Sequence, residues 1–139
     1  LVQLHDLAHT FCDLAGAEPL PFADGVSLTD VLRNPEGVPS RDALLNVYYG
    51  GEFLYTQRIL ITRRYKYVFN GFDIDELYDL QTDPHEVINQ VDNPEYAEVA
   101  DTLRVRLCSG GPAHGLEPIP CRAVFAQSAG TLRGERHSV

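Results

Sequence analysis

Apolar residues recur every three or four positions in the first part of the chain, and this spacing predicts an amphipathic helix over residues 2–15. Gly16 follows the last apolar position, where a left-handed residue commonly ends a helix. A two-turn helix is predicted to begin at Ser27 as its N-cap, with Asp30 three residues later in a capping-box-like pattern. The segment between the two helices contains prolines and an Asp-Gly pair, which predict a loop.

The pattern changes at Ala43, where β-branched and aromatic residues replace the helical spacing. Residues 43–50 and 53–62 are predicted strands, separated by two glycines. Residues 65–69 follow a tight connection and are expected to pair antiparallel with the strand before them. Tyrosine and phenylalanine alternate with Lys66 and a valine there, so Lys66 should face away from the tyrosines. Residues 75–80 are a fourth, short strand candidate.

The stretch "TDPHE" after the fourth strand predicts a turn, because Pro84 fixes one backbone dihedral and the preceding aspartate can cap the turn. Asn93 is then the predicted N-cap of a helix that has Pro94 at its first position. Five apolar residues give this helix one apolar face: Tyr96, Val99, Ala100, Leu103 and Leu107. Beyond residue 108 the sequence has no periodicity and is expected to form an extended tail.

The fold class predicted from this order is α+β, a small antiparallel sheet of three or four strands flanked by helices. We divide the chain into residues 1–42 (helix, loop, short helix), residues 43–108 (antiparallel sheet and helix) and residues 109–139 (tail).

Composition narrows the functional classes. The chain has 139 residues, 44% of them hydrophobic, and no run of about 18 apolar residues, so a soluble chain without a membrane span is predicted. A net charge of −9 disfavours nucleic acid and anionic membranes as partners. Four basic residues lie within nine positions: Arg58, Arg63, Arg64 and Lys66. They could bind an anion, but ion pairing with the acidic segment that follows is the favoured interpretation.

No self-contained catalytic motif is present. His5 and His9 lie four positions apart and could share a metal ion, but no third ligand is evident, so two polar helix positions are the favoured interpretation. The glycine-rich segment "GGPAHG" neither follows a strand nor opens a helix, and no nucleophile elbow occurs. The acidic residues between 73 and 83 lack the EF-hand spacing. We therefore predict no stoichiometric calcium or zinc and no catalytic residue within this chain.

Two segments carry a family resemblance. Residues 64–89, with the pattern R-Y-K-Y-V-F-N-G-F-D-x-D-E-L-Y-D-L-x-x-D-P-x-E-x-x-N, resemble the C-terminal subdomain of the sulfatase family in the alkaline phosphatase superfamily. Residues 4–28, "LHDLAHTFCDLAGAEPLPFADGVSL", are similar to the family's "DLAPT…DLAG…DG.SL" segment, with His9 where family members usually have proline. Together these segments extend the resemblance over residues 1 to about 108.

The resemblance implies an alkaline-phosphatase-like α/β hydrolase of which this chain is the C-terminal third, with residues 1–42 ending the catalytic domain. Family members use a formylglycine nucleophile, made from a C/S-x-P-x-R motif, and a calcium ion held by residues earlier in the polypeptide. Cys12, Cys108 and Cys121 each lack the proline and arginine of that motif. The sequence begins with Leu1 and contains no Met, so we expect a fragment or a processed chain that is inactive alone.

The functional prediction is thus a sulfuric ester hydrolase whose N-terminal domain, in the same polypeptide, is the partner of this segment. Its substrate would be a sulfated small molecule or sugar. The segment is expected to complete the fold and to wall one side of the substrate cleft, with Tyr49, Glu52 and Arg58 as candidate substrate-binding residues. Lys66 and Asn70 are assigned to holding the hairpin against the next strand. Two alternatives remain, namely a phosphonate or phosphodiester hydrolase of the same superfamily and a free-standing structural or interaction module.

Overall fold

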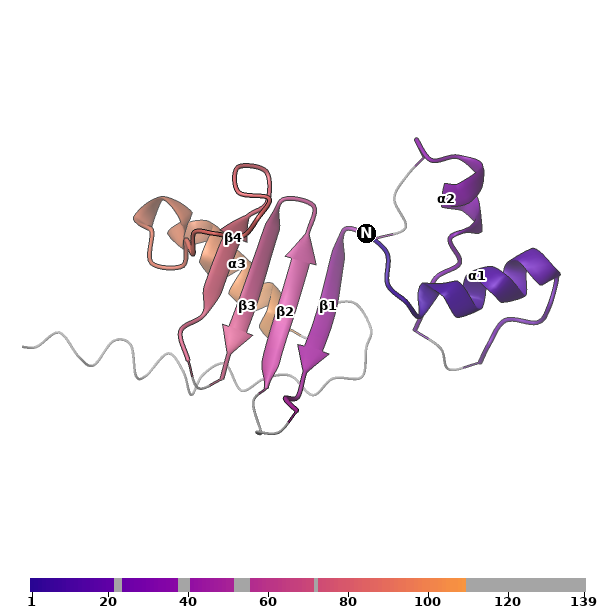
Figure 1. The fold of residues 1–139 in the computed structure, drawn as a ribbon, viewed down its shortest axis with the longest axis horizontal. Helices are drawn as coiled ribbons and strands as arrows, with labels where there is room; N and C mark the ends of the chain where they lie inside the picture. The colour runs from indigo at the N-terminus through magenta and orange to yellow at the C-terminus, as the bar shows by residue number, and fades with distance from the viewer. Residues whose placement is uncertain (22–23, 38–40, 52–55, 72, 110–139) are drawn as a thin grey trace, which may run out of the picture.

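The computed structural model describes residues 1–109 except 22–23, 38–40, 52–55 and 72, and the elements lie in two groups (Figure 1). Helices α1 (Asp6–Ala15) and α2 (Thr29–Arg33) lie on one side, beyond the β1 edge of a sheet. The sheet contains β1 (Ala43–Tyr48), β2 (Gln57–Thr62), β3 (Tyr65–Asn70) and β4 (Glu76–Asp79). A 3-10 turn, η1 (Pro94–Tyr96), leads into α3 (Ala97–Cys108).

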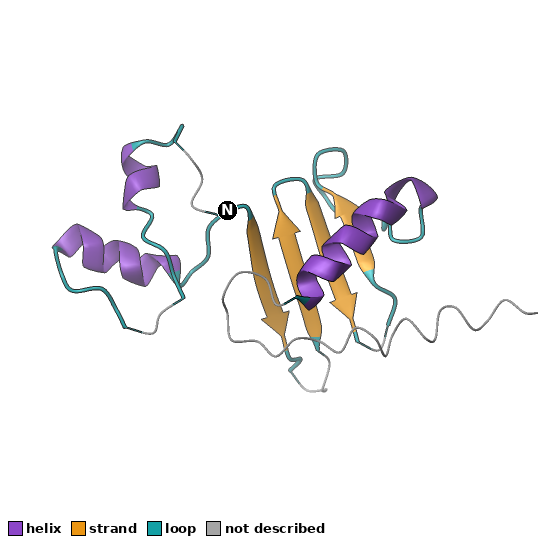
Figure 2. Ribbon diagram, turned by 180° about the vertical axis from the view of Figure 1, so that it is seen from behind, coloured by secondary structure: helices purple, strands orange, loops and turns teal. Residues whose placement is uncertain are grey.

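The four strands form an antiparallel sheet in the order β1-β2-β3-β4, which confirms the α+β fold class and the predicted strand pairing. One row of cross-strand neighbours is Leu45, Leu60, Tyr67 and Leu77, and the last three are completely buried. Helix α3 crosses this face of the sheet (Figure 2) and adds Ala100, Leu103 and Leu107 to the core. The apolar face predicted for α3 is therefore the face that packs.

The opposite face of the sheet, which we call the open face, is seen in Figure 1 with α3 behind the strands. Side chains alternate along a strand, so the open face carries the residues between those of the core rows. Its three rows across the strands are Leu44–Ile61–Lys66–Tyr78, Asn46–Ile59–Val68–Glu76 and Tyr48–Gln57–Asn70. Lys66 thus faces away from Tyr65 and Tyr67, as the alternation predicts.

The helical group departs from the sequence prediction at its helix starts. The first helix begins at Asp6 rather than residue 2, because the Asp6 side chain accepts the Gln3 backbone N–H (2.7 Å) and fixes a turn ahead of it. Gly16 ends α1 in the left-handed conformation (φ 65°), as expected. The second helix begins at Thr29 and Leu28 occupies its N-cap position, so Ser27 is not the N-cap; the Ser27 hydroxyl accepts the N–H of Thr29, the first residue of the helix (3.2 Å).

Other boundaries are also shifted: β1 ends at Tyr48 rather than residue 50, β3 extends to Asn70, and β4 is one residue shorter at each end than predicted. The second strand begins at Gln57, and residues 53–55 of the predicted strand fall outside the described residues. The Asn93 side chain accepts the Glu95 N–H (3.1 Å), which confirms the predicted cap, but it opens the 3-10 turn rather than the α-helix itself.

Candidate substrate-facing end of the sheet

Two of the three sequence-predicted site residues, Tyr49 and Arg58, lie at the end of the sheet where β1 and β3 finish and β2 and β4 begin. Tyr49 directly follows β1 and is 63% exposed. Arg58 lies opposite Val47 and Phe69 in the strand register, and therefore on the face that α3 covers. Glu52 lies outside the described residues. The structure thus brings Tyr49 and Arg58 to one end of the sheet, and their role as substrate contacts stays a prediction.

The last row of the open face lies at the same end and was not singled out from the sequence. Tyr48 is opposite Gln57, and Gln57 is opposite Asn70. The Gln57 amide donates to the Asn70 side-chain oxygen (2.7 Å), and Tyr48 is 50% exposed. The Tyr48 hydroxyl lies 3.9 Å from where a side chain at Gly51 would begin, so the ring extends alongside the glycine turn. Gly50 has φ 81°, a conformation that favours glycine.

Asn70 connects this row to the turn between β3 and β4. Its side-chain nitrogen donates to the Ile74 carbonyl (2.8 Å) and to Glu76 (3.1 Å). Its backbone N–H is accepted by the Asp75 carboxylate (3.1 Å). Asn70 is itself buried, so its amide replaces water as the partner of the turn. This geometry agrees with the scaffold role assigned to Asn70 from the sequence.

A buried phenol ties α3 to the same turn. Tyr67 is completely buried, donates its hydroxyl hydrogen to Asp75 and accepts a hydrogen bond from Arg104 of α3 (2.9 Å). Burial and the bond to Asp75 raise the pKa of Tyr67 well above its ordinary value, so the phenol stays protonated and remains a donor.

The acidic segment after β4 is fixed by the other residues of the family pattern. Asp83 accepts the backbone N–H groups of Val87 and Ile88 (2.8 and 2.9 Å), which confirms the predicted capped turn. Glu86 has φ 56° and forms an ion pair with Lys66 across the open face. The Asn89 side chain accepts the Leu77 N–H (2.9 Å) and donates to the Asp75 carbonyl. These two backbone groups at the edge strand β4 therefore have a hydrogen-bond partner.

A buried carboxylate lies at the other end of the sheet. Asp79 accepts hydrogen bonds from Arg64, in the turn between β2 and β3, through Nε (3.2 Å to each carboxylate oxygen) and Nη2 (2.8 Å), and it also accepts the Tyr96 hydroxyl (3.3 Å). The Arg64 guanidinium, which outweighs burial, holds the pKa of Asp79 below its ordinary value. Arg64 and Lys66 therefore form strand-to-loop ion pairs, as the favoured interpretation of the basic cluster predicted.

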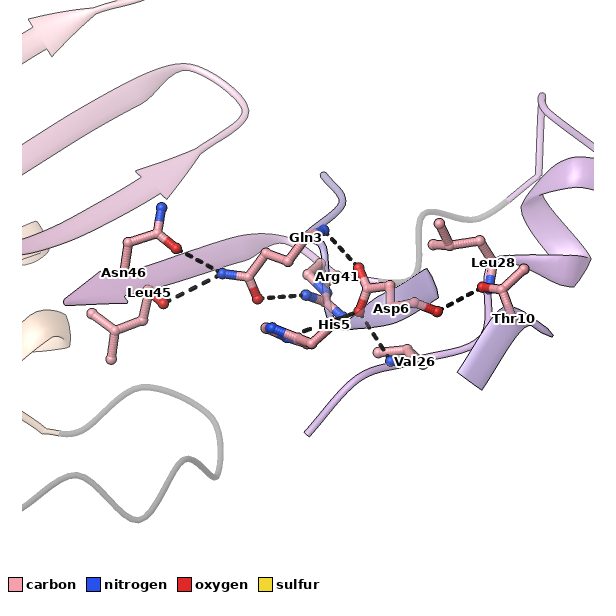
Figure 3. Close-up of polar contacts among 9 residues, drawn as sticks. All are labelled: Gln3, His5, Asp6, Thr10, Val26, Leu28, Arg41, Leu45 and Asn46. Atoms are coloured by element: carbon pink, nitrogen blue, oxygen red, sulfur yellow. Dashed lines mark hydrogen bonds and ion pairs between the residues drawn. The ribbon is translucent and has the colours of Figure 1, made fainter. Parts of the chain in front are cut away.

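The helical group is organised by a polar cluster around Asp6, shown in Figure 3. Asp6 is completely buried, and its carboxylate accepts hydrogen bonds from Gln3 N (2.7 Å), Val26 N (3.0 Å) and Arg41 (2.5 Å). Burial opposes ionisation, but these donors together lower the pKa of Asp6 below its ordinary value. The Gln3 side chain continues the cluster to Asn46 (2.8 Å) and the Leu45 carbonyl of β1.

The remaining residues of the first family segment support this cluster. Thr10 donates to the Asp6 carbonyl and accepts the Leu28 N–H, and the Ser27 hydroxyl donates to Asp13. A side chain at Gly25 would begin 2.3 Å from the His5 carbonyl oxygen, so only glycine fits there. Both family patterns therefore specify scaffold contacts in this chain.

No group of three or more His, Cys, Asp or Glu residues that could hold a metal ion occurs among the described residues. His5 lies 4.0 Å from Asp6, and the His9 ring lies beside Gly25. Within the described part of the chain, no helix is long and apolar enough to cross a membrane.

Comparison with known proteins shows to which family this chain belongs. Residues 1–110 match the family described as N-sulphoglucosamine sulphohydrolase, C-terminal. The chain is 34% identical to an uncharacterized protein of Haemophilus influenzae, over 71% of this chain and 50% of that protein. It is 36% identical to a choline-sulfatase of Rhizobium meliloti, over 64% of this chain and 17% of the enzyme.

Solved structures show the same relationship. A 2-O GAG sulfatase superposes with a TM-score of 0.63 at 29% identity, covering 70% of this chain and 22% of that one. The phosphonate monoester hydrolase of Agrobacterium radiobacter superposes with a TM-score of 0.61 at 26% identity, covering 75% and 23%. The chain therefore spans half or less of the length of these proteins.

Proposed function

Because the chain belongs to the family of N-sulphoglucosamine sulphohydrolase C-terminal domains, we propose that it serves in the hydrolysis of sulfuric esters as the C-terminal segment of a larger sulfatase. The observation that carries this proposal is the family match over residues 1–110. The structure supports it, since the residues of both family patterns make the contacts that hold the segment together.

The reacting groups are assigned to the rest of the polypeptide. We assign the calcium donors and the formylglycine motif to that part, because each cysteine here lacks the C/S-x-P-x-R context and the described residues contain no group that could hold a metal ion. Calcium, when bound there, would supply positive charge for the sulfate oxygens. We assign no chemical step to a residue of this chain.

The exposed apolar face of α1 is the proposed contact with that remaining part. Leu7, Phe11 and Leu14 follow the three- and four-residue spacing of one side of the helix with exposed fractions of 41%, 64% and 59%, and Leu4, in the turn before α1, is 86% exposed. A continuous apolar stripe of this kind marks a surface that another element covers. Phe11→Ala should therefore leave the stability of the 139-residue chain nearly unchanged and destabilise the full-length polypeptide by about 1–3 kcal/mol. Equal effects in both would contradict the assignment.

The loop end of the sheet is the part proposed to approach the substrate. Among the described residues, the candidates there are Tyr49, which is exposed beside the Gly50–Gly51 turn, and Arg58. Glu52, which lies outside the described residues, is the third candidate. Glycine at a turn lets the backbone come close to a ligand, which is why this end is preferred over the Arg63–Arg64 turn.

The direct test is turnover by the full-length polypeptide with 4-nitrophenyl sulfate and, in parallel, with a 4-nitrophenyl phosphonate monoester. We expect hydrolysis of the sulfate ester that is lost on replacing the nucleophile residue of the C/S-x-P-x-R motif, and no turnover by the 139-residue chain alone. A clear preference for the phosphonate would favour the second candidate, a phosphonate or phosphodiester hydrolase, which the superposition with the Agrobacterium enzyme supports. Turnover of neither substrate would favour the structural module.

A further inference from the structure

The last row of the open face combines two surfaces that ligands use. Tyr48 presents a half-exposed aromatic ring with a polar tip, and Gln57 beside it presents an amide. Both are part of β-strands rather than loops, so the register of the sheet fixes their spacing.

The Gln57 amide is held in one orientation. Its nitrogen donates to the Asn70 oxygen (2.7 Å), and Asn70 is in turn held by the β3–β4 turn through Ile74 and Glu76. Among the contacts of the described residues, none donates to the Gln57 carbonyl oxygen, which remains an available acceptor. Asn70 is thus the support, and Gln57 and Tyr48 are the groups that a ligand would meet.

The chemistry of the two groups selects the ligand class. Neither side chain is charged, so the pair lacks the positive charge that makes the hydrogen bonds to a sulfate or carboxylate strong. A wholly apolar ligand would leave the Gln57 carbonyl buried without a partner, which costs about 1–3 kcal/mol. A sugar ring fits both groups, because its C–H face can stack on an aromatic ring while its hydroxyls bond to an amide.

We propose that Tyr48 and Gln57 contact the hydroxyl-bearing ring of a sulfated sugar whose sulfate lies in the reacting centre of the full-length protein. This inference rests on the proposed function and deepens it, since it names the part of the substrate that this segment recognises. Tyr48 and Gln57 lie on the open face, whereas the candidate Arg58 lies at the same end of the sheet on the face that α3 covers.

The test measures binding of glucosamine-2-N,6-O-disulfate and of inorganic sulfate to the full-length polypeptide by calorimetry. Tyr48→Ala and Gln57→Ala should each raise the Kd of the sugar about three- to tenfold, the loss expected for one aromatic contact or one hydrogen bond, and leave that of sulfate unchanged. Gln81→Ala is the matched control, since Gln81 is an exposed glutamine at the opposite end of the sheet.

Three results would overturn the proposal. The first is no binding of the sugar by the unsubstituted protein. The second is an unchanged sugar Kd in both variants. The third is a fall in melting temperature with equal losses for sugar and sulfate, which would make the row a contact between parts of the protein. Turnover of 4-nitrophenyl sulfate is measured separately, so a protein that binds the sugar through these residues without sulfatase activity would reject the proposed function alone.

Discussion

The helical group and the sheet bury opposite kinds of side chain. In the sheet, the largest completely buried residues are Leu60, Tyr67 and Leu77, and α3 closes the apolar core over them. Among the described residues of the helical group, the buried ones are Asp6, Thr10 and Thr29, while the large apolar side chains of α1 are exposed. The sheet therefore contains its own source of stability. The helical group has a polar centre and an apolar outside, as expected of a segment that completes a larger body.

The strongest way to break this comparison is to remove one leucine from each region. Leu77→Ala should destabilise the chain by about 2–5 kcal/mol, because Leu77 is completely buried between the sheet and α3. Leu14→Ala should change stability by less than about 0.5 kcal/mol, because its side chain is exposed. Urea unfolding of the 139-residue chain, followed by circular dichroism, measures both. Equal losses would show that the helical group has an apolar core of its own.

The polar centre is tested by Asp6→Ala. The substitution leaves the Val26 N–H and most of the Arg41 guanidinium without their partner, so we expect a loss of about 1–3 kcal/mol confined to the helical group. Hydrogen exchange should rise in α1 and stay unchanged in β2 and β3. Asp30→Ala, at an exposed aspartate of α2, is the control. If protection in β2 and β3 falls as well, the two regions unfold as one unit.

Acid should separate the two regions. In the helical group, hydrogen bonds outweigh burial and lower the pKa of Asp6, and the Ser27 hydroxyl lowers the pKa of Asp13. Arg106 of α3 lowers the pKa of Asp42, which precedes β1. In the sheet, Arg64 lowers the pKa of Asp79. A carboxyl with a lowered folded pKa stabilises the protein above its unfolded pKa of about 3.9, and this stability is lost as the pH falls through the folded value.

The helical group is built around the buried Asp6 carboxylate, whereas the core of the sheet is apolar, so the helical group should lose exchange protection at a higher pH than β2 and β3 when the pH is lowered below about 4. Asp6→Asn should remove most of this difference. Loss of protection in β2 and β3 first would mean that Asp79 is the dominant acid-sensitive group.

The strands and α3 were predictable because their signals are local. β-Branched and aromatic alternation marks the strands, Gly16 marks the end of α1, and Asn93 marks a cap. The Asp6 cluster was not predicted, since its partner Arg41 lies 35 residues away and no local pattern joins them. Asp6 and Thr10, four residues apart on one helix face, were the available signal. The Ser27 cap was wrong because the helix begins two residues later, at Thr29, and the Ser27 hydroxyl joins that first residue to Asp13 of α1.

The sequence predicted at which end of the sheet the candidate site lies, but not on which face of the sheet. Glycines 50 and 51 indicated a close approach of the backbone, but the face on which each neighbouring side chain lies depends on strand register. Arg58 shares its face with Val47 and Phe69, while Gln57, one residue earlier, shares the open face with Tyr48. The register therefore adds Tyr48 and Gln57 to the residues to be tested.

The smallest expected effects on stability come from substituting single charged residues of the hairpin formed by β2 and β3. Lys66 pairs with Glu86 across the open face, and a partly exposed pair of this kind contributes about 0.2–1 kcal/mol. In the full-length polypeptide, if it hydrolyses sulfate esters as proposed, Lys66→Ala should lower the melting temperature slightly and leave KM unchanged, because it loosens the segment after β4 without reaching a ligand. Arg58→Ala and Glu52→Ala should do the reverse and raise KM or change substrate preference. If all of these variants lose stability with no change in KM, the hairpin is scaffold throughout and the assignment of Arg58 and Glu52 to the substrate wall is wrong.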